Sequence, residues 1–596
     1  MVLVDTHKLA NILKLAHKAF FKYKKKIVIL TALGFISGLL ESIGVNALIP
    51  LFSFATKNKE YGSDLVTDVI EKTFNFLHIN FNIRYLLIFV CLMFVLKAVM
   101  LIISSYISVR ITTDYEKATR SDLYKKTMNS DWPHLIQQKL GYLENTIMTD
   151  VQYSANLLQQ LSDTIMVITS LLMYILIAIN ISLYITLITL VLGLCLFFFF
   201  KPTMYRIKNN AEKMVQFNKK ISHFINESIV GIKTVKATMA GEKLMERAKL
   251  FFEELNVYKI KIFLLRNITQ SFIQPISLIF ICVIFAIYYK SANFNLPSMI
   301  AIVYLIQRIF QYIQQLQGRF QSINEAYPYL KNAINFSEAS SQHQEQNKGN
   351  EPYQFTNQLV FKDVSFSYHE NKAVLEKIDF TINKGMMVGL IGPSGAGKTT
   401  IVDLILRLYQ HESGQILLDG RDIKKIELKQ WRKNIGYISQ DMFLLNDTIA
   451  NNIKFYDEAV GPAEIQAAAK MANIDDFVES LPEKYESIIG ERGVLLSAGQ
   501  RQRIVIARVL AKQPEFLILD EATSALDNES EFKIQQVLEK LKGKITIIAI
   551  AHRLSTIIES DKLLVLENGK IIEEGKPADL LKAKESYFYK VYNIRN

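Results

Sequence analysis

Hydrophobic residues are distributed unevenly along this chain of 596 residues. Up to about residue 336, long apolar runs recur, whereas after about residue 356 short apolar stretches alternate with charged segments. A helix of roughly 20 apolar residues is needed to cross a hydrocarbon core about 30 Å thick. Several runs in the first part reach that length. The pattern therefore predicts a membrane-embedded helical part followed by a soluble α/β domain.

Six membrane spans are expected, and the sixth is the weakest because it is rich in glutamine. The spans lie near residues 27–54, 85–109, 157–179, 181–200, 267–289 and 297–317. Basic residues precede the first span and fill the long segments 110–156 and 201–262. By the positive-inside rule, the N-terminus, both long loops and the α/β domain are cytoplasmic. The basic N-terminal stretch lacks the short apolar core of a cleavable signal, so we expect an interfacial helix there.

The polar stretch 337–355 has the composition of a linker. We therefore expect a transmembrane domain over residues 1–336 and a second domain over residues 356–596. The net charge of +12 fits the basic cytoplasmic loops, and no aromatic and basic recognition module indicates nucleic-acid binding. The three cysteines, Cys91, Cys195 and Cys282, fall inside predicted spans. Their spacing is not that of a metal or redox site, so we expect them to be packing residues.

The stretch VGLIGPSGAGKTTIVDLIL, residues 388–406, is an apolar strand, a glycine-rich loop and an apolar helix. Its glycines let backbone N–H groups surround phosphate oxygens at a helix N-terminus. Lys398 is placed to neutralise the β and γ phosphates, and Thr399 to ligate Mg²⁺. The expected nucleotide-binding residues of this loop are Gly392, Pro393, Ser394, Gly395, Ala396, Gly397, Lys398, Thr399 and Thr400.

A second apolar strand, in EFLILDEATSALD, ends in two acids. Asp520 is placed to hold magnesium, and Glu521 to polarise the attacking water. A strand that ends in two solvated acids is common. Taken alone, this pattern would favour neither a catalytic site nor an ordinary strand end. With the phosphate loop upstream, and with His552 at the end of another apolar strand, the pattern favours an ATP-hydrolysing site.

These motifs resemble the nucleotide-binding domain of ATP-binding cassette (ABC) proteins, in the order of that family. Tyr368 resembles the aromatic residue that stacks on adenine, and Gln440 in GYISQD resembles the glutamine that contacts magnesium. LSAGQ, residues 496–500, resembles the family signature, Asp527 ends the D-loop, and His552 resembles the switch histidine. Six spans before such a domain is the half-transporter layout of ABC exporters, so the resemblance covers essentially the whole chain.

The resemblance implies an ATP hydrolase coupled to transport, with ATP and Mg²⁺ as cofactors. Thr399, Gln440 and Asp520 would hold the metal, and Glu521, His552 and Gln440 would act in hydrolysis. Ser497, Gly499 and Gln500 would close over ATP bound to a partner chain. One phosphate loop and one signature per chain then imply a dimer, in the simplest form a homodimer. Ala498 replaces the usual first glycine of the signature. It adds a methyl group close to the phosphate and tolerates positive φ poorly, and we expect at most a modest effect.

The transported molecule is not fixed by these motifs. Glu41, Lys97 and Arg308 interrupt the spans, and such residues usually face a cavity or pair with one another. A cavity with cations and apolar walls suits an amphipathic substrate with an anionic head. The first span is similar to that of exporters of lipid-linked saccharides and glycolipids. We therefore favour flipping of a lipid or lipid-linked saccharide across a bacterial inner membrane, with membrane lipids as neighbours.

Three alternatives remain open at this point. The first is an exporter of peptides or hydrophobic drugs, although no peptidase domain precedes the first span. The second is a soluble cassette ATPase that acts on DNA or ribosomes, which the predicted spans argue against. The third is an ATP-regulated channel or receptor, which would not need the hydrolytic Glu521 and His552.

Overall fold

The structure is a computed structural model that describes most of the chain. The described residues are 14–15, 17–47, 50–51, 71–72, 74–76, 78, 80–289, 296–347, 349–368, 373–521, 527–550 and 557–595. It divides into two compact units. One consists of Met1–Ser130 and His134–Gln344, and we call it the membrane unit. The other consists of Asp131–Pro133 and Glu345–Asn596, and we call it the nucleotide unit.

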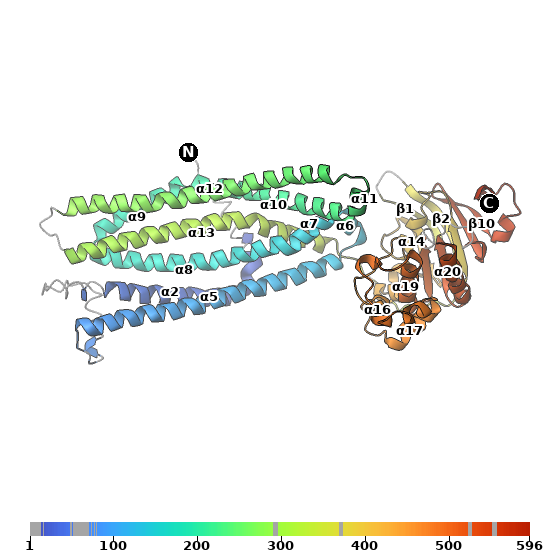
Figure 1. Cartoon of the computed structure of the whole chain (residues 1–596), viewed down its shortest axis with the longest axis horizontal. Coiled ribbons are helices and arrows are strands. Elements are labelled where there is room, and N and C mark those ends of the chain that lie inside the picture. The colour runs from blue at the N-terminus through green and yellow to red at the C-terminus, as the bar shows by residue number, and fades with distance from the viewer. Residues whose placement is uncertain are drawn as a thin grey trace. The chain divides into compact units, whose positions relative to one another are not determined.

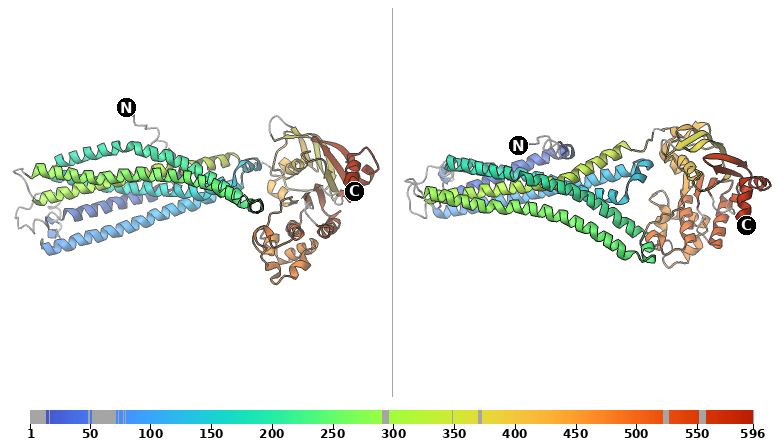
Figure 2. Two further views of the ribbon diagram at one scale, coloured as in Figure 1. Left: turned by 45° about the horizontal axis from the view of Figure 1, so that its top comes forward. Right: turned by 90° about the horizontal axis from the view of Figure 1, so that it is seen from above.

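Long helices make up the membrane unit, and they run side by side in all three views (Figures 1 and 2). Their apolar composition leaves the helix as the structure that satisfies every backbone group without water. The long helices are α2 (Lys24–Asn46), α5 (Ile83–Met128), α8 (Val151–Ile181), α9 (Leu183–Phe199), α10 (Lys201–Val230), α12 (Gly241–Tyr288) and α13 (Leu296–Gln342). Short helices are α6 (Trp132–Gln137), α7 (Leu140–Asn145) and α11 (Ile232–Ala237).

Five helical segments of the described chain are long and apolar enough to cross a membrane. They are His17–Val45, Ile83–Met128, Gly141–Ile181, Leu183–Val230 and Gly241–Tyr288. The sixth expected span forms the first part of α13 and is not among these five. Its glutamines lower the hydropathy, so a sixth crossing stays a prediction. The helices extend far beyond the expected spans, since α5 has 46 residues and α12 has 48.

The three cysteines correct one expectation. Cys91, Cys195 and Cys282 are free thiols with exposed side chains. They lie on α5, α9 and α12, and they therefore face outward from the bundle of this chain. The expectation that they are packing residues was wrong, because an apolar environment outside the bundle accepts a thiol as readily as its interior does.

Charged side chains inside the bundle correct a second expectation. Glu41 of α2 is only 2% exposed. Its Oε1 atom lies 2.7 Å from Lys97 Nζ of α5, and its Oε2 atom accepts a hydrogen bond of 2.8 Å from Tyr312 Oη of α13. Both carboxylate oxygens are thus engaged within the bundle. Glu41 therefore does not line an open cavity of this chain. Its burial is tolerated because pairing with Lys97 offsets the cost of removing the charge from water.

Two sheets carry the nucleotide unit (Figure 1). The larger sheet has the order β10-β9-β3-β8-β7-β6, with parallel pairing from β9 to β6, and the smaller antiparallel sheet has the order β2-β1-β4-β5. The strands are β1 (Gln358–Ser367), β2 (Ala373–Asn383), β3 (Met387–Ile391), β4 (Ser413–Leu418), β5 (Arg421–Asp422), β6 (Ile435–Ile438), β7 (Phe516–Asp520), β8 (Thr546–Ile550), β9 (Lys562–Glu567) and β10 (Lys570–Gly575).

The central strands β3, β7 and β8 are buried at every position, which explains their unbroken apolar sequences. Helices cover this sheet and form several hydrophobic cores. A first core includes α14, a second includes α19, and a smaller one lies beneath α22 and α23. The helices are α14 (Lys398–Ile405), α15 (Leu428–Lys433), α16 (Ile449–Lys454), α17 (Pro462–Met471), α18 (Asp475–Glu479), α19 (Ala498–Leu510), α20 (Asn528–Leu541), α22 (Pro577–Leu580) and α23 (Tyr587–Arg595).

Arg508 ties the second core together. Its guanidinium donates hydrogen bonds to the carbonyl oxygens of Asn452 and Phe443, each at 2.7 Å, and to Asn452 Oδ1 at 3.1 Å. Its Cζ atom lies 4.2 Å from the centroid of the Phe455 ring. Burial lowers the pKa of this guanidinium to about 10, so Arg508 is still charged at neutral pH. It fixes α19 to α16 and to the loop that follows β6.

We predict that Arg508→Met lowers the stability of the nucleotide unit by about 2–5 kcal/mol, because three buried acceptors lose their donor. Thermal unfolding of the purified full chain measures this effect. Arg508→Lys is the matched variant, which keeps the charge but loses the planar fork and should recover only part of the loss. Equal stability of Arg508→Met and the unchanged chain would contradict this role.

Candidate nucleotide site

The glycine-rich loop joins the end of β3 to the start of α14. Gly392 has φ of 152° and Gly397 has φ of 106°. A Cβ atom on Gly392 would lie 1.9 Å from the carbonyl oxygen of Leu566. Only glycine therefore fits at position 392, because the backbone has positive φ and because a side chain would clash with the Leu566 carbonyl oxygen. The loop ends where Lys398 begins α14, whose free N–H groups make this helix terminus attractive to an anion.

Lys398 is buried within this loop. Its Nζ atom donates to the carbonyl oxygens of Gly392 and Pro393, each at 2.9 Å. Burial lowers the pKa of this ammonium group, while the negative charges of Glu521 and Asp520 raise it. The ammonium is thus held against the loop by carbonyl oxygens, which phosphate oxygens can replace as stronger, charged acceptors.

Two acidic residues lie at the end of β7, which pairs with β8: Asp520 is its last residue and Glu521 follows it. Asp520 is 6% exposed, and its burial raises the pKa of the carboxyl group, with a further rise from the charge of Glu521. Glu521 adopts a left-handed φ of 50°, and its N–H donates to the Ile550 carbonyl oxygen at 2.9 Å. This conformation costs of order 1–3 kcal/mol in a residue other than glycine. The surrounding structure therefore holds the Glu521 side chain in a defined direction.

Gln440 and Tyr437 approach these acids from the strand β6 and the loop that follows it. Gln440 Nε2 donates a 2.9 Å hydrogen bond to Glu521 Oε2. Tyr437 Oη lies 3.5 Å from Asp520 Oδ2, as a long hydrogen bond. Sequence reasoning missed Tyr437, although its position three residues before Gln440 on a strand paired with β7 is a usable signal. The structure thus brings Gln440 and Glu521 together, with Asp520 beside them.

Oxygen donors are what Mg²⁺ prefers, and it commonly uses one or two carboxylates, water and phosphate rather than a protein cage. The Asp520 carboxylate, the exposed Thr399 hydroxyl and the Gln440 amide form such a set. No group of three or more His, Cys, Asp or Glu residues suited to a metal occurs in the described part of the chain. The residues present therefore fit a magnesium ion that shares its ligands with a nucleotide.

Tyr368 follows the end of β1. Its Oη atom shares a 3.0 Å hydrogen bond with Thr400 Oγ1 of α14, and its ring meets the Tyr409 ring edge-on at 5.1 Å between centroids. The Tyr368 side chain is 42% exposed. The ring is thus fixed at one edge beside the phosphate loop and keeps exposed surface on which a base can stack.

The signature begins α19 with a reciprocal cap. Ser497 Oγ accepts a hydrogen bond of 3.2 Å from the Gln500 N–H, and the Ser497 N–H donates to Gln500 Oε1 at 2.8 Å. This arrangement satisfies two of the helix's otherwise unpaired donors. Ala498 is the first residue of α19 and does not have positive φ. The backbone at Ala498 therefore tolerates a methyl group, and the effect of this alanine on activity stays a prediction.

Gly499 has a reason to lack a side chain that its sequence motif does not reveal. A Cβ atom there would lie 2.1 Å from Ser530 Oγ and 2.5 Å from Ser530 Cβ. Ser530 belongs to α20, and its N–H donates to Asp527 Oδ2 at 3.1 Å. The signature helix and the helix capped by Asp527 are thus in direct contact. Sequence reasoning missed Ser530 because this contact depends on the packing of two helices.

His552 lies outside the described residues, as does most of the D-loop, residues 522–526. The placement of His552 relative to the phosphate loop therefore stays a prediction.

A membrane unit of long apolar helices together with a nucleotide unit carrying these motifs defines a membrane-embedded ATPase. The family model described as ABC transporter matches residues 375–524, and the model described as ABC transporter transmembrane region matches residues 27–316. The heterocyst differentiation ATP-binding protein HepA of Nostoc sp. is 33% identical over 462 residues, which cover 76% of this chain and 74% of that protein. The chain belongs to the ABC transporter family.

Other relatives agree with this assignment. The ATP-dependent lipid A-core flippase of Saccharophagus degradans is 39% identical over 370 residues, covering 61% of each chain. The solved structure of a bacterial Atm1-family ABC exporter with ATP bound has the same fold, with a TM-score of 0.79 and 23% sequence identity over 96% of this chain and 99% of that one. The chain is an ABC exporter that binds ATP and couples its hydrolysis to transport, as expected from its motifs.

We predict that Gly499→Ala lowers ATPase activity and that Ser530→Gly in the same chain restores part of it. The first change places a methyl group on Ser530, and the second removes the atoms it strikes. ATPase assays of the two single variants and the double variant form a mutant cycle that measures this coupling. If the double variant stays as inactive as Gly499→Ala, Gly499 is needed for another contact, such as close approach to a nucleotide.

Proposed function

We propose that two copies of this chain form a homodimer that uses ATP to move an amphipathic molecule with an anionic head across the bacterial inner membrane. The substrate we favour is a lipid or a lipid-linked saccharide. The N-terminus and the nucleotide unit lie in the cytoplasm in this proposal, as the basic loops of the membrane unit support. Alternating access follows when the nucleotide units close on ATP and separate after hydrolysis.

In hydrolysis, a water molecule attacks the γ-phosphorus of ATP and ADP leaves. Glu521 orients this water and accepts its proton, and the 2.9 Å hydrogen bond from Gln440 holds the Glu521 carboxylate in place. Lys398 exchanges its two carbonyl acceptors for β and γ phosphate oxygens. Asp520, Thr399 and Gln440 would hold Mg²⁺, which would supply positive charge to the phosphates when bound. His552 is the proposed contact to the γ-phosphate.

The homodimer is supported by the separation of the two larger cores of the nucleotide unit. The helix after the phosphate loop, α14, packs in the first core, whereas the signature helix α19 packs in the second. Ser497 and Gly499 thus belong to a different part of the unit from Lys398. A second copy brings its signature to this chain's phosphate loop and receives the same in return, which is the symmetric arrangement of a two-fold dimer.

We predict that Glu521→Gln still binds ATP but loses turnover by about a hundredfold or more, because the water loses its general base. The variant should accumulate as a closed dimer with ATP, which cross-linking of the full chain in nanodiscs detects. Glu515→Gln is the control, since Glu515 precedes the same strand and only pairs with Lys384 on the surface. Normal turnover of Glu521→Gln would defeat this assignment.

The observation that carries the substrate proposal is the charge on Arg308. Its Nε donates to Tyr304 Oη and its Nη1 donates to Gln311 Oε1, each at 2.8 Å, and both partners are neutral. Among the described residues, no carboxylate forms an ion pair with Arg308. The charge of Glu41 acts on Arg308 at longer range, but the Glu41 carboxylate is itself paired with Lys97, so this group keeps one excess positive charge. Arg308 lies in the expected sixth span, where an uncompensated cation is costly. An anionic head group would supply the missing charge.

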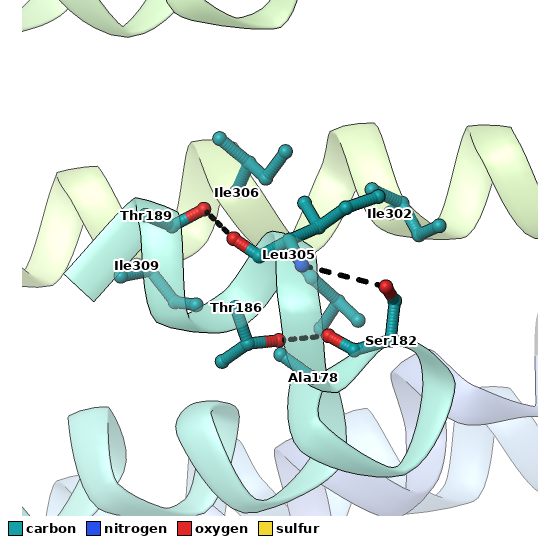
Figure 3. A pocket seen from close by; sticks show the side chains of 9 residues that line it. Ala178, Ser182, Thr186, Thr189, Ile302, Leu305, Ile306 and Ile309 are labelled. Carbon is teal, nitrogen blue, oxygen red and sulfur yellow. Dashed lines mark hydrogen bonds between the residues drawn. The ribbon is translucent and has the colours of Figure 1, made fainter. Parts of the chain in front are cut away.

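A small apolar pocket, with space for about one water molecule, marks a loosely packed apolar contact in the same unit. It lies between α8, α9 and α13 (Figure 3). Thr186 and Thr189 turn their hydroxyls to the backbone carbonyls of Ser182 and Ile185, at 2.7 and 2.8 Å. The polar atoms are thus satisfied within α9 and leave an apolar wall. The lining residues are Ala178, Ser182, Ile185, Thr186, Thr189, Ile302, Leu305, Ile306 and Ile309.

The similarity to a lipid A-core flippase also supports a lipid substrate. The second candidate is export of peptides or hydrophobic drugs, which the family membership allows equally well. The uncompensated Arg308 favours the anionic lipid over uncharged drugs.

We predict that Arg308→Gln raises the anionic-lipid concentration needed for half-maximal ATPase stimulation by about tenfold or more, because a charge-assisted contact is lost. Titration of the reconstituted chain with anionic lipids, peptides and neutral dyes measures the half-maximal concentrations. Arg206→Gln, an exposed arginine outside the expected spans, is the control. Stimulation by peptides or dyes alone would reverse the choice of substrate.

A further inference from the structure

Three glutamines form a polar stripe on α13. Gln307, Gln311 and Gln315 are four residues apart and all three are exposed, so they follow one face of the helix over about 12 Å. They fall within the expected sixth span, residues 297–317. Glutamine side chains are poorly placed against lipid, because hydrocarbon offers them no hydrogen-bond partner. This glutamine stripe therefore needs a polar occupant.

The glutamine stripe makes few side-chain hydrogen bonds within the described helix bundle of this chain. In the described structure, the side chains of Gln307 and Gln315 make no hydrogen bond, and Gln311 uses only its carbonyl oxygen, toward Arg308. Two other polar residues of α13, Gln314 and Arg319, are engaged with neighbouring helices. Gln314 donates to the Gln270 carbonyl oxygen of α12 at 2.8 Å, and Arg319 pairs with Asp163 of α8 at 3.0 Å. Gln317 and Gln321 of α13 also have unpaired amides, but these are buried inside the unit. Among the described residues of the expected sixth span, the exposed glutamines Gln307 and Gln315 are therefore the ones whose free amides an outside molecule can reach.

We propose that the glutamine stripe binds the hydroxyl groups of a saccharide, and that Arg308 binds the phosphate that joins this saccharide to its lipid. This inference rests on the proposed function and narrows its substrate to a lipid-linked saccharide. The primary amide of glutamine has two donors and an acceptor oxygen with two lone pairs, so it pairs with hydroxyls that donate or accept. Three neutral amides add no charge, which suits a head group that is rich in hydroxyls rather than anions.

A second copy of the chain is the competing occupant, since a polar helix face can pack against its symmetry mate. The charge on Arg308 argues against this occupant. A two-fold axis through the stripe would bring a second Arg308 toward the first, and like charges repel in a medium of low dielectric constant. A phosphate between the glutamines and the lipid tail has the opposite charge and relieves this repulsion.

The experiment compares two probes that differ only in the sugar. One is a synthetic polyprenyl diphosphate that carries a trisaccharide, and the other is the same polyprenyl diphosphate without sugar. The full chain in nanodiscs is titrated with each probe, and ATPase stimulation is followed. We expect the saccharide probe to act at about a tenfold lower concentration than the sugar-free probe, and the triple variant Q307L/Q311L/Q315L to lose this difference between the two probes.

Gln152→Leu, an exposed glutamine of α8 outside the expected spans, is the matched control and should behave as the unchanged chain. Equal responses of the unchanged chain to both probes would overturn the saccharide inference and leave the anionic-lipid proposal standing. No response to either probe would overturn the proposed function itself. Loss of the dimer in the triple variant, seen by light scattering, would show that the stripe packs against the second copy and would also overturn the inference.

Discussion

The balance of charge at one edge of the parallel sheet governs the nucleotide unit. Asp520 and Glu521 place two acids side by side, and their negative charges partly oppose the burial that lowers the pKa of the cation Lys398. Burial makes each of these charges expensive without a partner. The glycine loop, the hydrogen bond from Gln440 and the strained backbone at Glu521 all hold this small set in place. A bound nucleotide with its metal would place negative phosphates near Lys398 and a positive ion near Asp520, so each buried charge would have a partner of opposite sign.

Much of this arrangement could be predicted from the sequence, because local patterns encode it. The apolar runs of β3 and β7 identify buried parallel strands, and the residues after each strand must meet at one sheet edge. Ser497 followed by Gln500 is a local signal for the start of a helix, and the structure has that cap. The ABC family and its exporter layout likewise follow from motifs in order along the chain.

The rest depends on which faces of distant segments meet. The sequence shows that Glu41 and Lys97 interrupt spans, but only tertiary packing shows that they pair with each other and with Tyr312. Gly499 is part of a recognisable motif, yet its contact with Ser530 arises where α19 crosses α20. The cysteines were expected to pack inside because apolar spans do not reveal which side faces the bundle.

The left-handed backbone at Glu521 restricts how this position can drift during evolution. Asparagine and aspartate tolerate that conformation comparatively well, whereas β-branched residues do not. A change to aspartate would thus leave the chain folded while withdrawing the carboxylate by one methylene group. Selection for stable folding alone would therefore not exclude aspartate at position 521. Only selection for ATP turnover would keep glutamate there.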